Sequence, residues 1–278
     1  MNLTQKRKLA GVSYLGITNQ SAKLMKNLKI NNVLTYSLYL SPAHTSGYEV
    51  CKDSTPECRM GCLNTSGLAK VEFHAGMSRI KDARITKTKL FFENNDLFMS
   101  ILVDEIESAI RKANKIDALF SVRLNCTSDI DWVNVLFNGK NIFQIFPDVE
   151  FYDYTKNFKK FENKPENYHL TYSYTGYNWS LCEKVLSMGY NVAMVFNIHK
   201  NGILPISYKG IEIISGDLSD YRIADTNGVI IGLVWKKIGN LKHNELVRFS
   251  RFCTQPTDKN LTYPILDVFK EVKLSKVA

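Results

Sequence analysis

Short apolar runs alternate along this chain with segments of helical periodicity. Residues 33–40 (VLTYSLYL) combine β-branched and aromatic side chains, a composition typical of a strand. Residues 96–115 repeat apolar side chains every three or four positions, which predicts an amphipathic helix with Asp96 as its N-cap. Further strands are expected at 118–124, 148–154, 168–172, 190–196, 211–215 and 229–235, and further helices at 131–137 and 179–188, the latter ended by Gly189.

The alternation of strands and helices predicts an α/β fold. The runs at 190–196, 211–215 and 229–235 are continuously apolar, as strands of parallel sheets are when helices cover both faces. Six or seven such strands favour a partial or complete (β/α) barrel of parallel strands. An open doubly wound sheet is the alternative, and the pattern of strands does not separate the two.

The chain shows no linker and no internal repeat, so we expect a single domain with peripheral arms. Residues 1–33 are polar and basic, which predicts an N-terminal extension on the surface. Residues 34–250 are expected to form the α/β domain, and residues 251–278 a C-terminal tail that packs on it.

Polar side chains cluster directly after the predicted strands. In barrels and in open α/β sheets, ligands lie at the carboxyl ends of the strands, so we expect a site at this edge. The residues expected to take part in catalysis, or to orient the substrate or cofactor, are Arg123, Asn125, Asp129, Asp217 and Asp220. The residues expected to bind the substrate are Lys156, Ser173, Tyr174, Asn197, Arg222 and Lys236.

Each of these clusters also has a purely structural explanation, because strand ends are loops and loops are polar. Ser128 and Asp129 can cap a helix at Trp132. Asp217 and Asp220 can form a turn that pairs with Arg222. The functional interpretation therefore depends on the clusters meeting at one edge of the sheet.

Three cysteines lie within twelve positions of one another in the loop after the first predicted strand. Cys51, Cys58 and Cys62 form the pattern C-x6-C-x3-C, and neighbouring thiolates suit a soft metal or an iron–sulfur cluster. A structural zinc site needs a fourth ligand, for which His74, Cys126 or a more distant cysteine is available. Three cysteines alone leave one coordination position open, as a reactive cluster requires. Reduced structural thiols are the remaining explanation.

Composition and charge narrow the class of protein. Six cysteines without a secretory signal argue against a disulfide framework, and the apolar runs are too short to span a bilayer, so we expect no membrane partner. There are 36 Lys and Arg against 27 Asp and Glu, a formal charge of +9, which favours a polyanionic partner such as nucleic acid. Much of that excess belongs to lysines near the two ends of the sequence.

Several familiar catalytic motifs are absent from the sequence. No GxxxxGK[ST] loop is present, which argues against a P-loop ATPase. The GxGxxG, GxSxG and HExxH patterns are missing as well. The five histidines are dispersed.

Several stretches together resemble the phage family called gene product 88. They include SPAHTSGYEVCKDSTPECRMGCLNTSG, VRLNCTSDIDW, FYDYTKN, NYHLTYSYTG, LPISYKGIEIISGDLSDYRIAD and GVIIGLVWKK, and they cover roughly residues 40–237. The resemblance implies a phage- or plasmid-derived protein that works in the cytoplasm of a bacterial host cell. It implies no particular activity.

The cysteine loop also resembles that of radical-SAM enzymes. In that family, three loop cysteines hold a [4Fe–4S] cluster that binds S-adenosylmethionine inside a partial (β/α) barrel. Cys51, Cys58 and Cys62 would be the ligands, although the spacing differs from the usual C-x3-C-x2-C and no GGE-like motif is present.

Two functions are therefore carried forward. The first is an iron–sulfur, radical-SAM-like enzyme that acts on a nucleic acid or nucleotide and uses S-adenosylmethionine. The second is a nucleic-acid-binding protein, related to replication, in which zinc stabilises the cysteine loop and no bond is broken.

Overall fold

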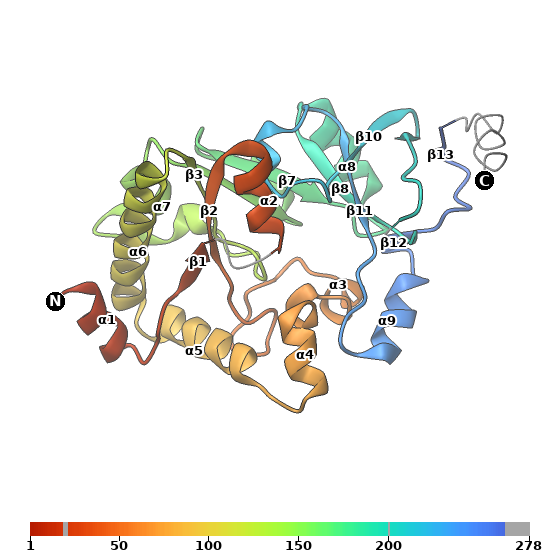
Figure 1. The fold of residues 1–278 in the computed structure, drawn as a ribbon. Coiled ribbons are helices and arrows are strands. Elements are labelled where there is room, and N and C mark those ends of the chain that lie inside the picture. Colours follow the sequence, from red (N-terminus) through yellow and green to blue (C-terminus); the bar gives the residue numbers. More distant parts are fainter. Residues whose placement is uncertain (19–21, 200, 265–278) are drawn as a thin grey trace, which may run out of the picture.

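The computed structural model describes residues 1–18, 22–199 and 201–264, and its centre is one large, mostly parallel sheet (Figure 1). The parallel strands lie in the order β2 (Val33–Leu38), β3 (Leu119–Arg123), β6 (Glu150–Thr155), β7 (Tyr168–Ser173), β8 (Asn191–Phe196), β11 (Ile230–Val234) and β10 (Ile211–Ser215). The α/β class and all seven of these predicted strands are confirmed.

Short strands extend the sheet at both edges. β1 (Gly16–Thr18) pairs antiparallel with β2, while β9 (Ser207–Tyr208) and β13 (Leu261–Thr262) continue antiparallel from β10. β12 (Cys253–Thr254) pairs with the end of β8. A separate hairpin joins β4 (Leu136–Phe137) and β5 (Lys140–Asn141).

One face of the sheet is apolar and holds the main core. Tyr36, Val122 and Phe151 are buried on it, and α6 (Asn95–Lys115) packs across β2 and β3 through residues such as Ile101 and Leu102. α7 (Ile142–Ile145) and α8 (Trp179–Ser187) contribute buried side chains to the same core. Side chains alternate between the faces of a strand, so burial of every second residue here directs its neighbours to the opposite face.

The opposite face, called here the polar face, carries hydroxyl, amide and charged side chains. The register places Thr35 beside Ser121 and their hydroxyls lie 3.0 Å apart. α2 (Ala22–Asn31) covers this part of the face, and Asn27 donates from Nδ2 to Thr35 Oγ1 at 3.0 Å and to the Tyr152 hydroxyl at 3.2 Å. Buried polar groups cost free energy unless they are hydrogen-bonded. The hydrogen bonds of this network offset that cost, so this face of the sheet can be buried under α2 with polar side chains.

A helical insertion of residues 39–94 separates β2 from α6. It contains the cysteine loop, α3 (Pro56–Met60), the 3-10 turn Leu63–Thr65, α4 (Leu68–His74) and α5 (Arg79–Glu93). Figure 1 shows these orange helices grouped below the sheet with α9 (Leu241–Arg248), which contacts α3. The cysteine loop is part of this insertion and lies near the carboxyl ends of the strands.

The first residues are tied firmly to the domain. α1 (Leu3–Leu9) packs on α6, and β1 adds an edge strand to the sheet. Glu105 of α6 is buried and accepts hydrogen bonds from the backbone N–H groups of Leu15 and Gly16 and from the Tyr36 hydroxyl, at 2.6–3.1 Å. The region predicted as a surface extension thus supplies an edge strand held by a buried carboxylate.

Two local predictions are corrected by the structure. The helix expected at 131–137 is a single 3-10 turn, Trp132–Asn134, followed by the β4–β5 hairpin. The N-cap of α6 is Asn94, whose side chain accepts from Leu97 N at 3.2 Å, and not Asp96. Two more 3-10 turns follow β6 (Phe158–Phe161) and β10 (Arg222–Ala224).

The C-terminal segment returns to the sheet through β12 and β13, and the rest of the predicted tail lies outside the described residues. Within the part of the chain that is described, no helix is both long and apolar enough to cross a membrane.

Candidate functional site

Parallel pairing brings the predicted site residues to one edge of the sheet. The cysteine loop follows β2, Arg123 ends β3, Lys156 follows β6, and the loop of Asp217 to Arg222 follows β10. Within that edge the side chains fall into four separate groups.

The first group is the cysteine loop. Its three thiols lie close enough to influence one another electrostatically: burial raises the pKa of Cys51 to about 12, and the Cys62 and Cys58 sulfurs add to that rise. Burial likewise raises the pKa of Cys62 to about 11. Cys51 Sγ also lies 3.9 Å from the Thr127 carbonyl oxygen, which anchors the loop to the end of β3.

Local sequence explains how the loop turns back on itself. Thr55 is the N-cap of α3 and accepts from Cys58 N at 3.2 Å, with Pro56 as the first helical residue. The helix ends after one turn at Gly61, where a side chain would meet Val247 of α9 at 2.9 Å. This single turn brings Cys58 and Cys62 to the same part of the loop.

Two cations face the thiols. The Lys156 ammonium group makes a hydrogen bond with Cys58; burial lowers its pKa, but Cys58 and Asp129 outweigh that effect and raise it above the ordinary value. Arg84 of α5 lies near Cys62 and Cys126, and its pKa is lowered by burial. Arg84 is held by Asn64 O at 2.9 Å and lies over the Tyr39 ring. Positive charge beside thiols favours their deprotonated, ligating form.

The donor set suits a soft metal or a cluster, although the side chains are not arranged as a finished site. Among the described residues, no three His, Cys, Asp or Glu side chains converge as metal ligands. With raised pKa values, Cys51 and Cys62 are protonated thiols, and a metal would have to displace those protons as it bound. Cys126 is also in this neighbourhood: its Sγ lies 3.7 Å from Arg123 O, and burial raises its pKa to about 11.

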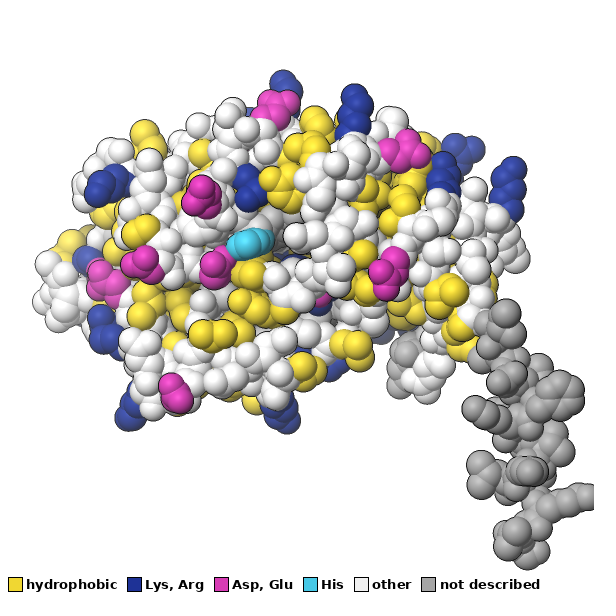
Figure 2. Space-filling view, turned by 90° about the horizontal axis from the view of Figure 1, so that it is seen from above, with side chains coloured by type: hydrophobic (Ala, Val, Ile, Leu, Met, Phe, Trp, Pro, Cys, Tyr) yellow, Lys and Arg dark blue, Asp and Glu magenta, His cyan; other side chains and the backbone are white. Residues whose placement is uncertain are grey.

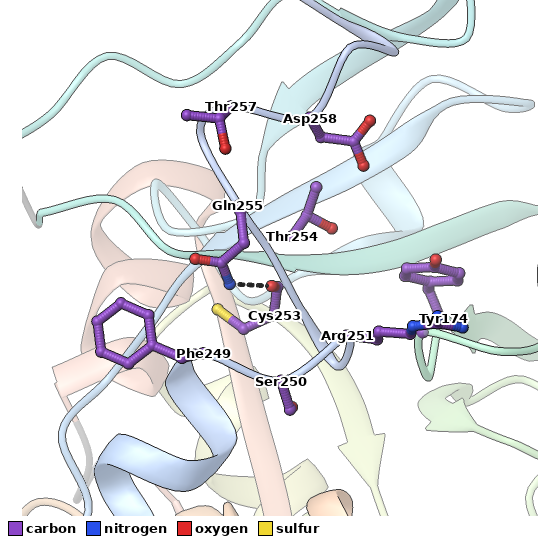
Figure 3. Close-up of a pocket in the computed structure, with 10 residues that line it drawn as sticks. Tyr174, Phe249, Ser250, Arg251, Cys253, Thr254, Gln255, Thr257 and Asp258 are labelled. Carbon is purple, nitrogen blue, oxygen red and sulfur yellow. Dashed lines mark hydrogen bonds between the residues drawn. The ribbon is translucent and has the colours of Figure 1, made fainter.

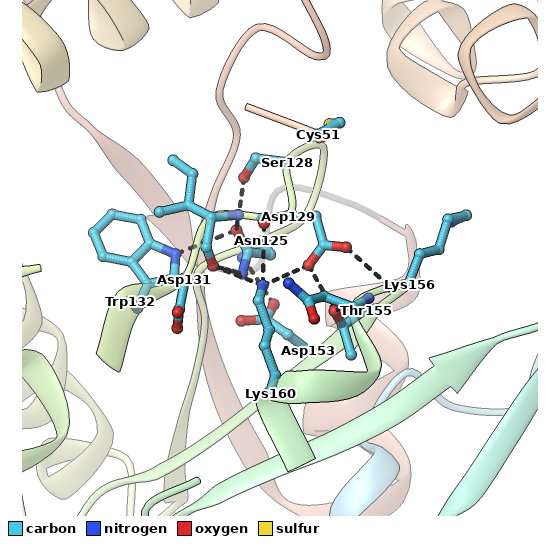
Figure 4. Close-up of polar contacts among 12 residues, drawn as sticks. Cys51, Asn125, Ser128, Asp129, Asp131, Trp132, Asp153, Thr155, Lys156 and Lys160 are labelled. Carbon is cyan, nitrogen blue, oxygen red and sulfur yellow. Dashed lines mark hydrogen bonds and ion pairs between the residues drawn. The ribbon is translucent and has the colours of Figure 1, made fainter. Parts of the chain in front are cut away.

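The second group surrounds Asn125 and Asp129 (Figure 4). Asn125 Oδ1 accepts from Ser128 Oγ and Ile130 N at 2.9 Å and from the Trp132 indole at 3.2 Å. Its Nδ2 donates to Ile130 O at 3.0 Å. These bonds occupy both ends of the Asn125 amide and favour a role in shaping the loop after β3.

Asp129 forms an ion pair with Lys160 Nζ at 2.6 Å and accepts from Thr155 Oγ1 and Lys156 N. The Lys160 side chain is 3% exposed and that of Asp129 is 12% exposed. Asp129 therefore ties the end of β6 to the loop after β3 and positions the backbone of Lys156 beside the cysteines.

The third group lies on the polar face, except for Asp153, which is on the same side of β6 as Phe151. Arg123 pairs with Asp220 at 2.7 Å, lies 4.0 Å from Asp153, and stacks over the Tyr154 ring at 4.9 Å. Asp153 also accepts from Asn125 N and from the Tyr168 hydroxyl, and burial raises its pKa to about 7. The pair between Arg123 and Asp220 joins β3 to the loop after β10.

Several buried polar atoms in this group have no hydrogen-bond partner among the described residues. They are Arg123 Nε, the Tyr154 hydroxyl and Arg222 Nε. Arg222 forms an ion pair with Asp225 at 3.0 Å and donates to Ser219 O. Unpaired buried donors are rare in folded proteins, so their concentration here favours a bound polar molecule or ordered water on the polar face.

The remaining predicted residues lie outside the first three groups. Asp217 pairs with Lys236 at 2.8 Å and accepts from Val234 N, in a half-exposed position. The fourth group contains Tyr174, which lines a hollow beside β12, and Asn197, which donates to Gln255 Oε1 at 2.7 Å and accepts from Arg248. Ser173 ends β7, and its carbonyl oxygen accepts from Asn178.

Sequence reasoning missed Arg84 and Lys160, and it gave no individual role to Asp153 and Tyr154 in the polar cluster before Lys156. Lys160 lies in an ordinary run of charged residues, and only its burial against Asp129 gives it a role. Asp153 and Tyr154 lie at the end of the predicted strand 148–154, within β6, and polar side chains at a strand end were a usable signal.

Comparison with known proteins identifies the family. The family model described as Gene product 88 matches residues 7–255. The chain belongs to this phage family. No curated protein and no solved structure matches the chain.

One face of this family member is mixed in charge. Figure 2 shows basic, acidic and apolar side chains interspersed over the face that it presents. The excess of basic residues is therefore not gathered into one continuous patch on that face, and a search for a nucleic-acid contact must look for a local site.

Proposed function

We propose that this Gene product 88 protein is an iron–sulfur enzyme that acts on a nucleotide or a nucleic acid. The observation that supports it best is the meeting of Cys51, Cys58 and Cys62 with the Lys156 ammonium group at the carboxyl edge of the sheet. Cysteines close enough to interact, facing a cation, fit an anionic cluster better than isolated structural thiols.

The topology supports the same proposal. The strands β2, β3, β6, β7 and β8 are neighbours in chain order, as the strands of a (β/α) barrel are. The order reverses after β8, where β11 lies between β8 and β10, so the barrel-like part is β2 to β8. The cysteine loop follows the first parallel strand, which is the position expected of a cluster loop in a radical-SAM-like enzyme.

In this proposal Cys51, Cys58 and Cys62 hold the cluster. A [4Fe–4S] cluster held by three thiolates supplies electrons and an open iron position, at which S-adenosylmethionine is the expected cosubstrate. Lys156 and Arg84 balance the negative charge of the thiolates. Asp129 positions the Lys156 backbone, and the unpaired donors of Arg123, Tyr154 and Arg222 are available to bind polar parts of a ligand.

Metal analysis tests the proposal directly. Protein purified or reconstituted without oxygen should be brown and contain iron and sulfide in stoichiometric amounts. Cys58→Ala should abolish this loading, whereas Cys253→Ala should not, because Cys253 is buried in β12 away from the loop. Equal loading in both variants would remove the cysteine loop from consideration.

The alternative, a zinc-stabilised nucleic-acid-binding protein, is favoured by one observation. Cys126 lies near Arg84 together with Cys62, so a fourth thiol is available close to the loop. Colourless protein with one zinc, lost in both Cys58→Ala and Cys126→Ala, would support this function and contradict the iron–sulfur enzyme. Metal-free protein would contradict both.

A further inference from the structure

Two neighbouring strands separate at the carboxyl edge of the sheet. β7 and β8 are paired up to Ser173 and Ala193, after which β12 replaces β7 beside the last residues of β8. Cys253 and Thr254 lie opposite Val195 and Phe196. In α/β sheets, a crevice outside the carboxyl ends of the strands is the usual place for a ligand.

A hollow of about 370 Å³ opens where the strands part (Figure 3). Its size is within the usual range for small-molecule sites. It is lined by Tyr174 and Gly176 after β7, by Phe249, Ser250 and Arg251 after α9, and by Cys253, Thr254, Gln255, Thr257 and Asp258 in and after β12. The hollow is thus built from two segments that are distant in the sequence, residues 174–176 and residues 249–258.

Aromatic rings and arginines are paired at this hollow. Phe249 is 62% exposed, and the Arg248 guanidinium lies over its ring at 5.3 Å. Tyr177, in the loop that continues from Gly176, is 61% exposed, and Arg251 lies over its ring at 5.7 Å. Large exposed rings beside cations are what proteins use to stack the bases of single-stranded nucleic acids and hold their phosphates.

The wall of the hollow is held by hydrogen bonds, and two of its polar atoms take part in none among the described residues. Gln255 donates to Arg248 O and Cys253 O and accepts from Asn197, so its amide is fully engaged. Thr254 is 6% exposed, and its buried Oγ1 has no hydrogen-bond partner among the described residues. Asp258 accepts from Asn260 through Oδ1 only. A hydroxyl and a carboxylate oxygen therefore remain for the edge of a ligand.

We propose that this hollow binds a nucleotide unit, with the base stacked on Phe249 and the phosphate on Arg251. The Thr254 hydroxyl and the Asp258 carboxylate would bond to the edge of the base, because bases offer both acceptors and N–H donors. The inference rests on the nucleotide substrate class of the proposed function and is independent of its cluster.

The test is direct binding of labelled single-stranded oligonucleotides and of free nucleoside monophosphates to the full-length protein. Phe249→Ala and Arg251→Ala should each weaken binding about tenfold, as the loss of one stacked base or one phosphate contact does. Phe92→Ala and Arg111→Ala, which change exposed residues on α5 and α6, serve as matched controls and should bind like the wild type.

Thr254→Val provides a second test that does not depend on the exposed rim. It removes a buried oxygen that has no partner among the described residues, so it should keep or raise the unfolding midpoint and still lower affinity for the nucleotide. An unchanged affinity together with unchanged or raised stability would contradict the proposed base contact.

The two proposals can fail separately. Binding by metal-free Cys58→Ala protein, at wild-type affinity, would support the hollow even if no cluster is ever found. Binding of the oligonucleotide alone would identify a nucleic acid as the ligand. Binding of the free monophosphate alone would identify a free nucleotide. Absence of binding to both, or equal binding by wild type, Phe249→Ala and Arg251→Ala, would overturn the inference.

Discussion

At the scale of single residues, burial decides the behaviour of the charged groups. Asp129 and Lys160 neutralise each other almost out of contact with water, whereas Arg111 and Glu107 form an exposed pair on α6 that contributes little to stability. Asn125 satisfies its amide entirely within its own loop. Asn125 and Asp129 were predicted from their position after a strand, and their contacts favour positioning roles.

Asp153 should make stability depend on pH. Its pKa is raised by burial from 3.8 to about 7, so the folded protein holds a proton that the unfolded chain releases between those values. The free energy of unfolding therefore contains a contribution that is fully present below about pH 4 and falls as the pH rises to about 7, by about 1.4 kcal/mol for each unit of pKa difference.

Asp153→Asn should remove this contribution. Denaturant unfolding of wild type and variant between pH 4 and pH 8 checks it: the stability of the wild type relative to the variant should decline with rising pH and level off above pH 7. The exposed Asp148→Asn provides the control. A difference between wild type and Asp153→Asn that is constant with pH would contradict the buried neutral carboxyl.

At the scale of secondary structure, the parallel strands were predictable and the N-terminal elements were not. Residues 190–196 and 229–235 are continuous apolar runs, which are typical of strands buried on both faces of a parallel sheet. β1 is three residues long and is held by Glu105 of α6, a long-range contact with no local signal. α5 buries Lys87 and Thr88, which hides its helical periodicity.

Glu105→Gln should release β1 from the sheet. The new amide N–H₂ would face other donors, namely the N–H groups of Leu15 and Gly16 and the Tyr36 hydroxyl, so hydrogen bonds to a charge worth about 2 kcal/mol would be lost. Hydrogen exchange at residues 15–18 should become faster, while Glu107→Gln, at an exposed position of the same helix, should leave it unchanged. Equal protection in both variants would show that Glu105 does not hold the strand.

At the scale of the whole molecule, the candidate site was predictable in outline and not in detail. Parallel strand ends must meet at one edge, so the cysteines, Arg123 and Lys156 could be assigned to it from the sequence. Their division into four groups depends on which side chains are buried together, as with Arg123, Asp220 and Tyr154. The hollow beside β12 was missed because Cys253 and Thr254 return to β8 from a distant part of the chain.

The net charge of +9 should appear as salt-dependent binding of single-stranded DNA. For single strands, the slope of log affinity against log salt is about −0.7 for each phosphate contacted, so a site with two phosphate contacts predicts a slope of about −1.4. Arg251→Ala should make the slope shallower by about 0.7, and Arg111→Ala should not change it. A wild-type affinity that is flat between low and moderate salt would exclude phosphate contacts.

The late return of β12 to β8 has a consequence for synthesis of the protein on the ribosome. Thr254 leaves the exit tunnel only after β11 and α9, so a nascent chain can assemble the parallel strands while the gap beside β8 is still unfilled. Competence to capture a ligand in that gap would arrive only after the scaffold of parallel strands has already folded.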